Sequence, residues 1–472
     1  MGAPTSFKAL MIVRAICVFL FYGAFPGVLP ALSLSSSTPQ EQAQFLAGIP
    51  LARESILEHL QQTAEYRLHQ KELRDQWAFC RNVRYDAMRE WGRVHLSSNP
   101  ASASVLRYLF GGPDFLNAYA FFPNTRIMVL GGLEPVGSVP PPEALDPTTM
   151  GAALKSLDEA LHTSLFCGYF ITSEMKPQFS RGTFQGVLPV LYTELALTGN
   201  VILTVQGVHP FDSPGVEITY HRPGGLTQIL YYFQSDLSNG GECKKFLDWL
   251  REMGPGASYL KAASYLLPLD SFSYTRDFLL KTSDLILQDD SGIPFRDFLS
   301  GDWSIQLFGA YTDPLPVFKL RREPELDAAY HSGNYVAKLP FGTGYHVNSD
   351  SANLLLATRR KLAEASGVTS PMDQAPAAIP AGILEPTPKS TPIRIRKALP
   401  IPIRKALPVP IRKAIPCATP KLIPPTTTLH SGSVPLNPPF QNLEPLPNSV
   451  ENPTSNPSPV AIPTTTSGKP VD

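Results

Sequence analysis

Across residues 40–368, apolar and polar positions follow the spacings of helices and strands in turn. Residues 40–98 are mostly polar with apolar side chains near helical spacing, which predicts two or three helices forming an N-terminal cap. A strand-like run at 105–110, a short aromatic helix at 114–122 and an apolar run at 126–130 follow. Strand, helix and strand in such quick succession predict an α/β core.

The clearest strand signal is an antiparallel hairpin. Residues 216–220 and 227–233 alternate with period two on either side of an Arg-Pro-Gly-Gly turn at 222–225. Similar patterns predict further helices at 149–166, 187–197, 242–253, 271–283 and 353–365, and further strands at 201–205, 285–287 and 303–308. Residues 99–368 are therefore predicted to form a mixed α/β domain, with a central sheet that contains at least one antiparallel hairpin and is flanked by helices.

The composition changes near residue 369. The stretch from 371 to 472 holds 24 of the chain's 49 prolines and, of all its aromatic residues, only Phe440. Such a segment cannot bury enough apolar surface to offset the conformational entropy lost on folding. We therefore expect residues 369–472 to form a disordered, Pro-rich tail.

The tail contains a basic repeat with a period of eight residues at 393–416. Its proline density favours polyproline II, which has three residues per turn, so successive basic pairs point in different directions. This arrangement suits diffuse attraction to an anionic envelope polymer or surface better than docking in a groove, and it indicates no specific nucleic acid. A solvated spacer, whose charges only keep it extended, is the favoured interpretation, and a tether to such a polymer or surface is the alternative. The basic pairs are Arg396 and Lys397, Arg404 and Lys405, and Arg412 and Lys413.

The N-terminus has the parts of a secretory signal peptide. Basic residues precede an apolar run at 15–25, and small residues stand at 31 and 33, the two positions that a signal peptidase reads. The run is too short to cross about 30 Å of hydrocarbon, although an uncleaved anchor over 15–34 is the alternative. We therefore expect residues 1–33 to be removed, which leaves no transmembrane span, and the chain to be exported to the periplasm, the cell surface or the medium.

Cysteine usage agrees with export only weakly. The spacing of the four cysteines downstream of the signal fits neither a CxxC redox motif nor a zinc site. An exported chain can pair two of them, and buried thiols are the alternative. The four are Cys80, Cys167, Cys243 and Cys417.

The adjacent carboxylates Asp289 and Asp290 are the first candidates for chemistry. They lie in a turn at 288–294, directly after a predicted strand, where α/β sheets commonly place their sites. Two carboxylates in a turn can ligate a divalent cation or share a proton in catalysis. Because one Asp-Asp pair without further ligands is a weak signal, a structural turn whose amides satisfy the carboxylates is the favoured interpretation. An active site would require a pocket and a third polar partner, for which the candidates are Glu134, Arg181, His209 and His221.

His209 and His221 are the second candidates, because each follows a predicted strand. If those strand ends adjoin, the two imidazoles converge with Asp212 or Glu217. A polar pair without a catalytic role is the alternative. The spacing Ser258-x-x-Lys261 matches penicillin-recognising enzymes but lacks their other motifs, so we reject it, and no cofactor motif is present.

Four short segments resemble patches shared by a group of uncharacterised bacterial exported proteins. They are residues 109–117, 122–123, 132–137 and 288–294, and the resemblance covers about residues 76–357. Because no activity is assigned to that group, the resemblance implies an exported bacterial protein and nothing about its chemistry.

These patterns favour an exported, non-catalytic binding protein of the envelope or the extracellular space, with a Pro-rich basic tether. The alternative is an exported hydrolase that acts on an envelope polymer through carboxylates near Asp289 and Asp290.

The tail generates the first testable prediction. Deletion of residues 371–472 should leave the midpoint of thermal unfolding nearly unchanged, because a segment of this composition contributes no core. Differential scanning calorimetry of the full and shortened chains measures this. A drop of several degrees would mean that the tail packs on the folded part.

Overall fold

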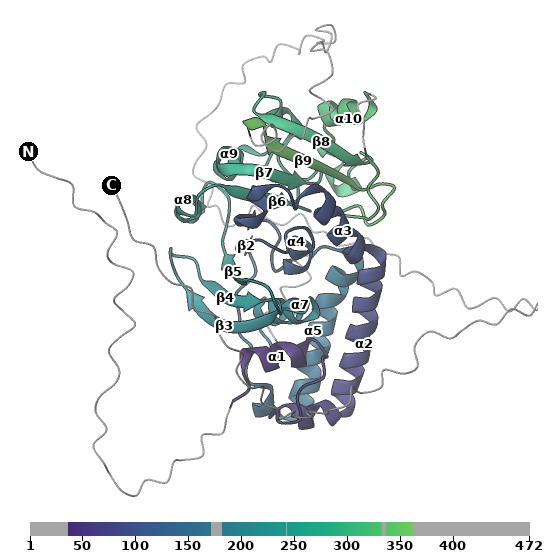
Figure 1. Cartoon of the computed structure of the whole chain (residues 1–472), viewed down its shortest axis with the longest axis vertical. Coiled ribbons are helices and arrows are strands. Elements are labelled where there is room, and N and C mark those ends of the chain that lie inside the picture. Colours follow the sequence, from purple (N-terminus) through teal and green to yellow (C-terminus); the bar gives the residue numbers. More distant parts are fainter. Residues whose placement is uncertain (1–35, 171–181, 242, 333–336, 362–472) are drawn as a thin grey trace, which may run out of the picture. The chain divides into compact units, whose positions relative to one another are not determined.

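A computed structural model describes residues 36–170, 182–241, 243–332 and 337–361 (Figure 1). The predicted signal segment, Arg181 and the whole tail lie outside the described residues. Within them the mixed α/β fold predicted from the sequence is confirmed, because helices flank a nine-stranded mixed sheet.

The strands are β1 (Val105–Tyr108), β2 (Ile127–Gly132), β3 (Val201–Val208), β4 (Gly215–His221), β5 (Thr227–Gln234), β6 (Gly256–Leu260), β7 (Ser283–Gln288), β8 (Trp303–Gly309) and β9 (Asn353–Arg359). They form one sheet in the order β3-β4-β5-β2-β1-β6-β7-β9-β8. The five central strands, from β5 to β7, are parallel. Antiparallel pairs complete both sides, and one of them, β4–β5, is the predicted hairpin.

The α-helices of the described residues are α1 (Pro39–Leu46), α2 (Ala64–Cys80), α3 (Asp86–His95), α4 (Phe115–Phe121), α5 (Pro147–Cys167), α7 (Leu188–Leu197), α8 (Cys243–Glu252), α9 (Ser273–Thr282) and α10 (Pro324–His331). A π-helical turn at Arg81–Tyr85 joins α2 to α3. Short 3₁₀ turns lie at Glu58–Gln62, Pro100–Ala103, Pro142–Ala144, Asp270–Phe272, Phe295–Phe298 and Pro316–Arg321.

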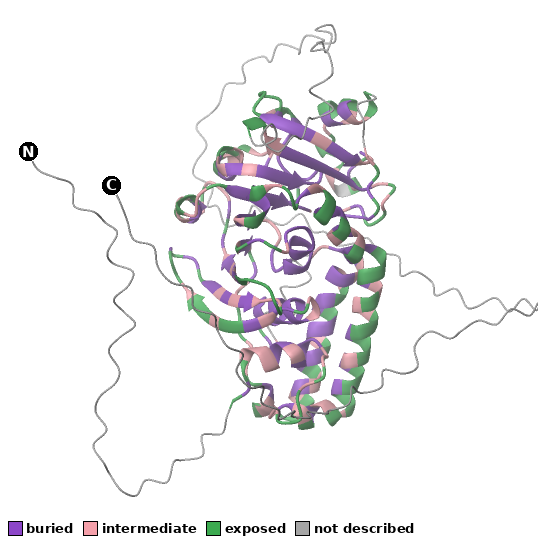
Figure 2. Ribbon diagram, in the orientation of Figure 1, coloured by how far each residue is buried: buried purple, intermediate pink, exposed green. Residues whose placement is uncertain are grey.

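The sheet separates two hydrophobic cores, because successive side chains of a strand point to opposite faces. In β2, Met128 and Leu130 pack with helices α1 to α7, whereas Val129 packs on the other face with α8, α9 and α10. Figure 2 shows the result, with the central strands and β9 buried along most of their length, the edge strand β3 largely exposed and α2 exposing its outer side. The N-terminal helices thus share one core with the sheet.

The ends of α5 show how local residues fix an element. Asp146 accepts hydrogen bonds of 3.0 Å from the amides of Thr148 and Thr149, and Pro147 occupies the first turn. At the other end Gly168 has a φ of +85°, the left-handed conformation that glycine adopts without strain.

The helix predicted at 353–365 is wrong, because residues 353–359 form the strand β9. The apolar run from 354 to 357 fits a helix and a buried strand equally well. Pairing decides between them, since β9 lies between β7 and β8, and residues 353–357 are buried. The five-residue strand β6 and the helix α10 are not among the elements that the sequence pattern predicts.

The chain changes direction across the sheet between β1 and β6. From β1 it passes to β2 and later to β5 on one side, and it then returns to β6 and β7 on the other side of β1. In open α/β sheets ligands bind outside the carboxyl ends of the strands at such a switch point. The loops that follow β1, β6 and β7 are therefore where a functional site is expected.

Two other expectations concern cysteines and membrane spans. Cys80 and Cys243 are buried free thiols, and the Cys167 side chain is buried as well. None of the helices in the described ranges combines the length and the apolar character needed to cross a bilayer.

Candidate functional site

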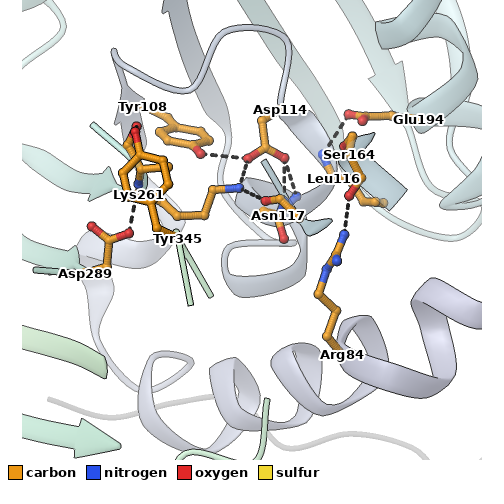
Figure 3. A network of polar contacts seen from close by, with 12 residues as sticks. Arg84, Tyr108, Asp114, Leu116, Asn117, Ser164, Glu194, Lys261, Asp289 and Tyr345 are labelled. Atoms are coloured by element: carbon orange, nitrogen blue, oxygen red, sulfur yellow. Dashed lines mark hydrogen bonds and ion pairs between the residues drawn. The ribbon is translucent and has the colours of Figure 1, made fainter. Parts of the chain in front are cut away.

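A buried ion pair occupies the switch point (Figure 3). Lys261, which follows β6, donates hydrogen bonds to Asp114, which follows β1, and to the carbonyl of Gly168. The Lys261 and Asp114 side chains are only 2% and 1% exposed. Burial lowers the pKa of Lys261, and the charge of Asp114 opposes that shift.

The remaining hydrogen-bonding capacity of Asp114 is taken by its own loop and helix. The Tyr108 hydroxyl donates to Oδ2 at 2.7 Å, and the Asn117 side-chain and backbone N–H groups donate to Oδ1 at 2.7 and 3.2 Å. A buried carboxylate is tolerated only when it is paired and hydrogen-bonded in this way. Asp114 therefore caps α4 and joins two strands, with no oxygen left for a ligand.

A second buried acid lies beside this pair. Glu194, in α7, accepts a 2.9 Å hydrogen bond from the Leu116 amide, and its other oxygen has no partner among the described residues. Burial, followed by the nearby Asp114, raises the pKa of Glu194 well above its usual value. Burial therefore favours the protonated form of Glu194, whose side chain contacts the start of α4.

Asp289 is buried and satisfied by donors of the protein itself. Oδ2 accepts a 2.8 Å hydrogen bond from the Ala262 amide, and Oδ1 accepts from the amide and the hydroxyl of Ser291. A Cβ atom at Gly344 would lie 1.9 Å from Oδ2, so the loop that contains Gly344 closes directly over the carboxylate. Burial and the adjacent Asp290 raise the pKa of Asp289 to about 6, although the Ser291 and Ala262 hydrogen bonds oppose the shift.

Asp290 is only partly satisfied. The Tyr265 hydroxyl donates to its Oδ2 at 2.7 Å. Its Oδ1 lies 3.9 Å from Nε2 of His346, and neither of these buried atoms has a hydrogen-bond partner among the described residues. Burial lowers the pKa of His346, but Asp290 and Asp289 outweigh that effect and raise it overall. Nδ1 of His346 lies 3.4 Å from the Thr312 hydroxyl.

The turn after β6 is strained. Ala262, Ser264 and Tyr265 have φ angles of 49°, 54° and 53°, and no other non-glycine residue in the described ranges has a positive φ. Such conformations cost about 1–3 kcal/mol each and persist only where the surroundings impose them. Here they direct the Ala262 amide to Asp289 and the Tyr265 hydroxyl to Asp290.

The predicted metal site at Asp289 and Asp290 finds no further ligands. No group of three or more His, Cys, Asp or Glu side chains in the described part of the chain is arranged to hold a metal ion. The oxygens of Asp289 already accept N–H and O–H donors, which a cation would have to displace.

His209 and His221 do not converge. The strands β3 and β4 are antiparallel, so Val201 pairs with His221 while Val208 pairs with Gly215. The two histidines therefore lie at opposite ends of this strand pair, far from Asp289. Asp212 instead pairs with Lys245, and Glu217 accepts a hydrogen bond from Gln206.

Glu134, another predicted partner of Asp289 and Asp290, forms no contact with them in the described structure. It follows β2, and its backbone carbonyl accepts a 2.8 Å hydrogen bond from the Tyr232 hydroxyl.

The rejected Ser258-x-x-Lys261 pattern does not form a catalytic pair either. Ser258 lies in the strand β6, and its hydroxyl forms a hydrogen bond with that of Ser283, so no helical turn brings it beside Lys261. The polar partners of Asp290 are Tyr265 and His346, which no sequence motif indicated.

A pocket of about 410 Å³ lies away from the switch point, beside α3 and the C-terminal end of α4. Its lining comes from four separate segments, which include Arg89, Arg93, Phe122 and Arg222. No sequence signal indicates this pocket, because these segments are distant in the chain and carry no motif.

Comparison with known proteins adds no relative. No family model matches the chain, and neither a curated protein nor a solved structure is significantly similar to it.

The buried ion pair predicts a large loss of stability when one partner is removed. Lys261→Met should lower the free energy of unfolding by roughly 3–5 kcal/mol, because Asp114 would remain buried without its cation. Urea unfolding followed by circular dichroism measures the loss. Lys244→Met is the matched control, because Lys244 forms an exposed pair with Asp248. Equal losses of unfolding free energy in Lys261→Met and Lys244→Met would contradict the prediction that the buried pair matters more than the exposed one.

The raised pKa of Asp289 predicts a pH dependence. Since folding raises this pKa from 3.8 to about 6, the stability that Asp289 contributes is complete below about pH 4 and is lost as the pH rises through 6. Relative to Asp289→Asn, the wild-type chain should therefore lose about 2 kcal/mol between pH 4 and pH 6.

The control for this measurement is Asp248→Asn. The Lys244 hydrogen bond, followed by that of Arg251, lowers the pKa of the exposed Asp248 from 3.8, so its contribution to stability is lost only as the pH falls below about 4. Between pH 4 and pH 6 the difference between wild type and Asp248→Asn should therefore change little. A flat difference between wild type and Asp289→Asn over this pH range would contradict the predicted shift.

Proposed function

We propose that the chain is an exported, non-catalytic binding protein of the bacterial envelope or the extracellular space, with a Pro-rich basic tail as its tether. The observation that carries this proposal is the closed state of Asp289. Each of its oxygens accepts hydrogen bonds from the protein, and the backbone of Gly344 lies against it. A carboxylate in this environment is not available to a substrate.

The surroundings of Asp289 support the same conclusion. Tyr345 lies over the turn after β6, and its hydroxyl donates to the Ala262 carbonyl at 3.0 Å. Ser264 and Tyr345 join their hydroxyls at 3.0 Å. The crevice that holds the ligand in other open α/β sheets is thus occupied by side chains of this chain itself.

Binding also requires a concave surface, and the pocket beside α3 supplies one. Its volume of about 410 Å³ falls within the range typical of small-molecule sites. The export signal and the basic tail support the location and the tether through their composition alone.

The second candidate function is an exported hydrolase. It is favoured by the facing, unpartnered atoms of Asp290 and His346, by the raised pKa of His346 and by the strained turn beside them. An imidazole and a carboxylate in one site are suited to general acid–base catalysis. For this function the loop that carries His346 would have to open.

Incubation with soluble fragments of bacterial envelope polymers separates the two functions. Wild type, Asp290→Asn and His346→Gln are each mixed with the fragments, passed through an ultrafilter and analysed by mass spectrometry. We expect wild type and both variants to retain the same fragments with their masses unchanged. Products formed by wild type and lost in both variants would contradict the proposal and support the hydrolase. Fragments that are neither retained nor changed would contradict binding of these polymers.

A further inference from the structure

The pocket beside α3 contains two acidic side chains, and both are neutralised from their own helical segment. Asp86 accepts hydrogen bonds of 3.2 and 3.0 Å from Arg81. Glu90 accepts bonds of 2.8 and 2.6 Å from Arg93, on the next turn of α3. Such two-bond pairs hold a carboxylate and a guanidinium in a fixed plane. The acids of the pocket are therefore already matched by cations.

Two further arginines in the pocket lack such a match. Arg89 projects from α3, and Arg222 opens the turn between β4 and β5. Within the described ranges neither guanidinium forms an ion pair or a hydrogen bond with an acid. The lining itself holds Arg89, Arg93 and Arg222 against Asp86 and Glu90. Because Arg81, just outside the lining, pairs with Asp86, the charges of Arg89 and Arg222 are the two that no acid of the pocket balances.

Two aromatic residues lie beneath these charges. Phe121 and Phe122 line the pocket and are almost fully buried. A Cβ atom at Gly92 would lie 3.0 Å from the Phe121 carbonyl oxygen, so α3 packs closely against the end of α4 and fixes the backbone from which Arg89 projects. Arg89 and Arg222 are only half-buried, so we expect salt to weaken, but not to abolish, their attraction for an anion.

The turn that carries Arg222 is also fixed. The amide of Gly225 donates a 2.7 Å hydrogen bond to the Arg222 carbonyl, and Gly224 adopts a φ of +75° that favours glycine. This hydrogen-bonded turn presents Arg222 from a segment 133 residues from Arg89 in sequence. Two guanidiniums delivered by separate, rigid elements can bind one anion from two sides.

We propose that this pocket binds the phosphate group of a phosphorylated small molecule, or of the end of a phosphate-bearing polymer, between Arg89 and Arg222. A phosphate monoester carries a charge of about −1.5 to −2 at neutral pH, which matches the excess positive charge better than a single carboxylate does. The pocket exceeds one phosphate in size, so it also has room for part of the group that carries the phosphate. This inference rests on the proposed binding function and names its ligand class.

Isothermal titration of the full chain with inorganic phosphate, glucose 6-phosphate and a glycerol phosphate oligomer tests the proposal. We expect saturable binding of at least one phosphate compound and no binding of glucose. Arg89→Gln and Arg222→Gln should each weaken that binding at least tenfold, and the double variant should abolish it. A preference for the oligomer over glucose 6-phosphate would identify a polymer end as the source of the phosphate.

Arg74→Gln is the matched control. Arg74 is an exposed arginine on α2 whose only ion pair is with the adjacent Asp75 in the described structure. The basic tail is present in every variant, so any binding to it cancels in the comparison. Unchanged thermal unfolding of the pocket variants shows that they fold.

Phosphate affinity that is equal in wild type and in both pocket variants would overturn the proposal. So would a loss of affinity in Arg74→Gln as large as that in Arg89→Gln. If the wild-type chain retains unchanged envelope fragments but binds none of the phosphate compounds, the proposal that the ligand is phosphorylated fails while the proposed binding function stands. If the wild-type chain cleaves the fragments, the proposed binding function itself fails.

Discussion

The buried ion pair between Lys261 and Asp114 is the interaction on which the centre of this fold depends. It joins the loops after β1 and β6 at the point where the chain changes direction across the sheet. Two charges in the interior must satisfy each other, and the hydrogen bonds of Tyr108 and Asn117 complete the requirement. The same contacts fix the start of α4 and, through the Gly168 carbonyl, the end of α5. The Lys261–Asp114 pair thus links the order of the strands, the positions of α4 and α5 and the burial of two charges at the switch point.

This coupling has a consequence for function. Open α/β sheets usually leave a crevice at the switch point, and charged side chains there commonly act on a ligand. In this chain the crevice is filled by the strained turn after β6 and by the loop that carries Gly344 and His346. Among the residues that line the pocket beside α3, Arg89 and Arg222 form no ion pair with an acid in the described part of the chain.

Much of the fold is predictable from the sequence, because hydrophobic period and turn residues are local signals. The order β1, α4, β2 and the β4–β5 hairpin follow from them directly. The strand β9 was mistaken for a helix because its leucines fit both, and only its neighbours β7 and β8 decide. The sequence located Asp289 and Asp290 correctly after a strand. It did not reveal the pairing of Lys261 with Asp114, since 147 residues separate them and neither forms a motif.

The most direct test of this account is the reactivity of the buried carboxylates towards a water-soluble carbodiimide, followed by peptide mass spectrometry in increasing urea. If the switch point is closed by the protein itself, Asp86 and Glu90 react in the native protein, whereas Asp289 and Asp290 react only as the whole domain unfolds. Modification of Asp290 under native conditions, at a rate similar to that of Glu90, would mean that the switch point is open to solvent and would contradict the account.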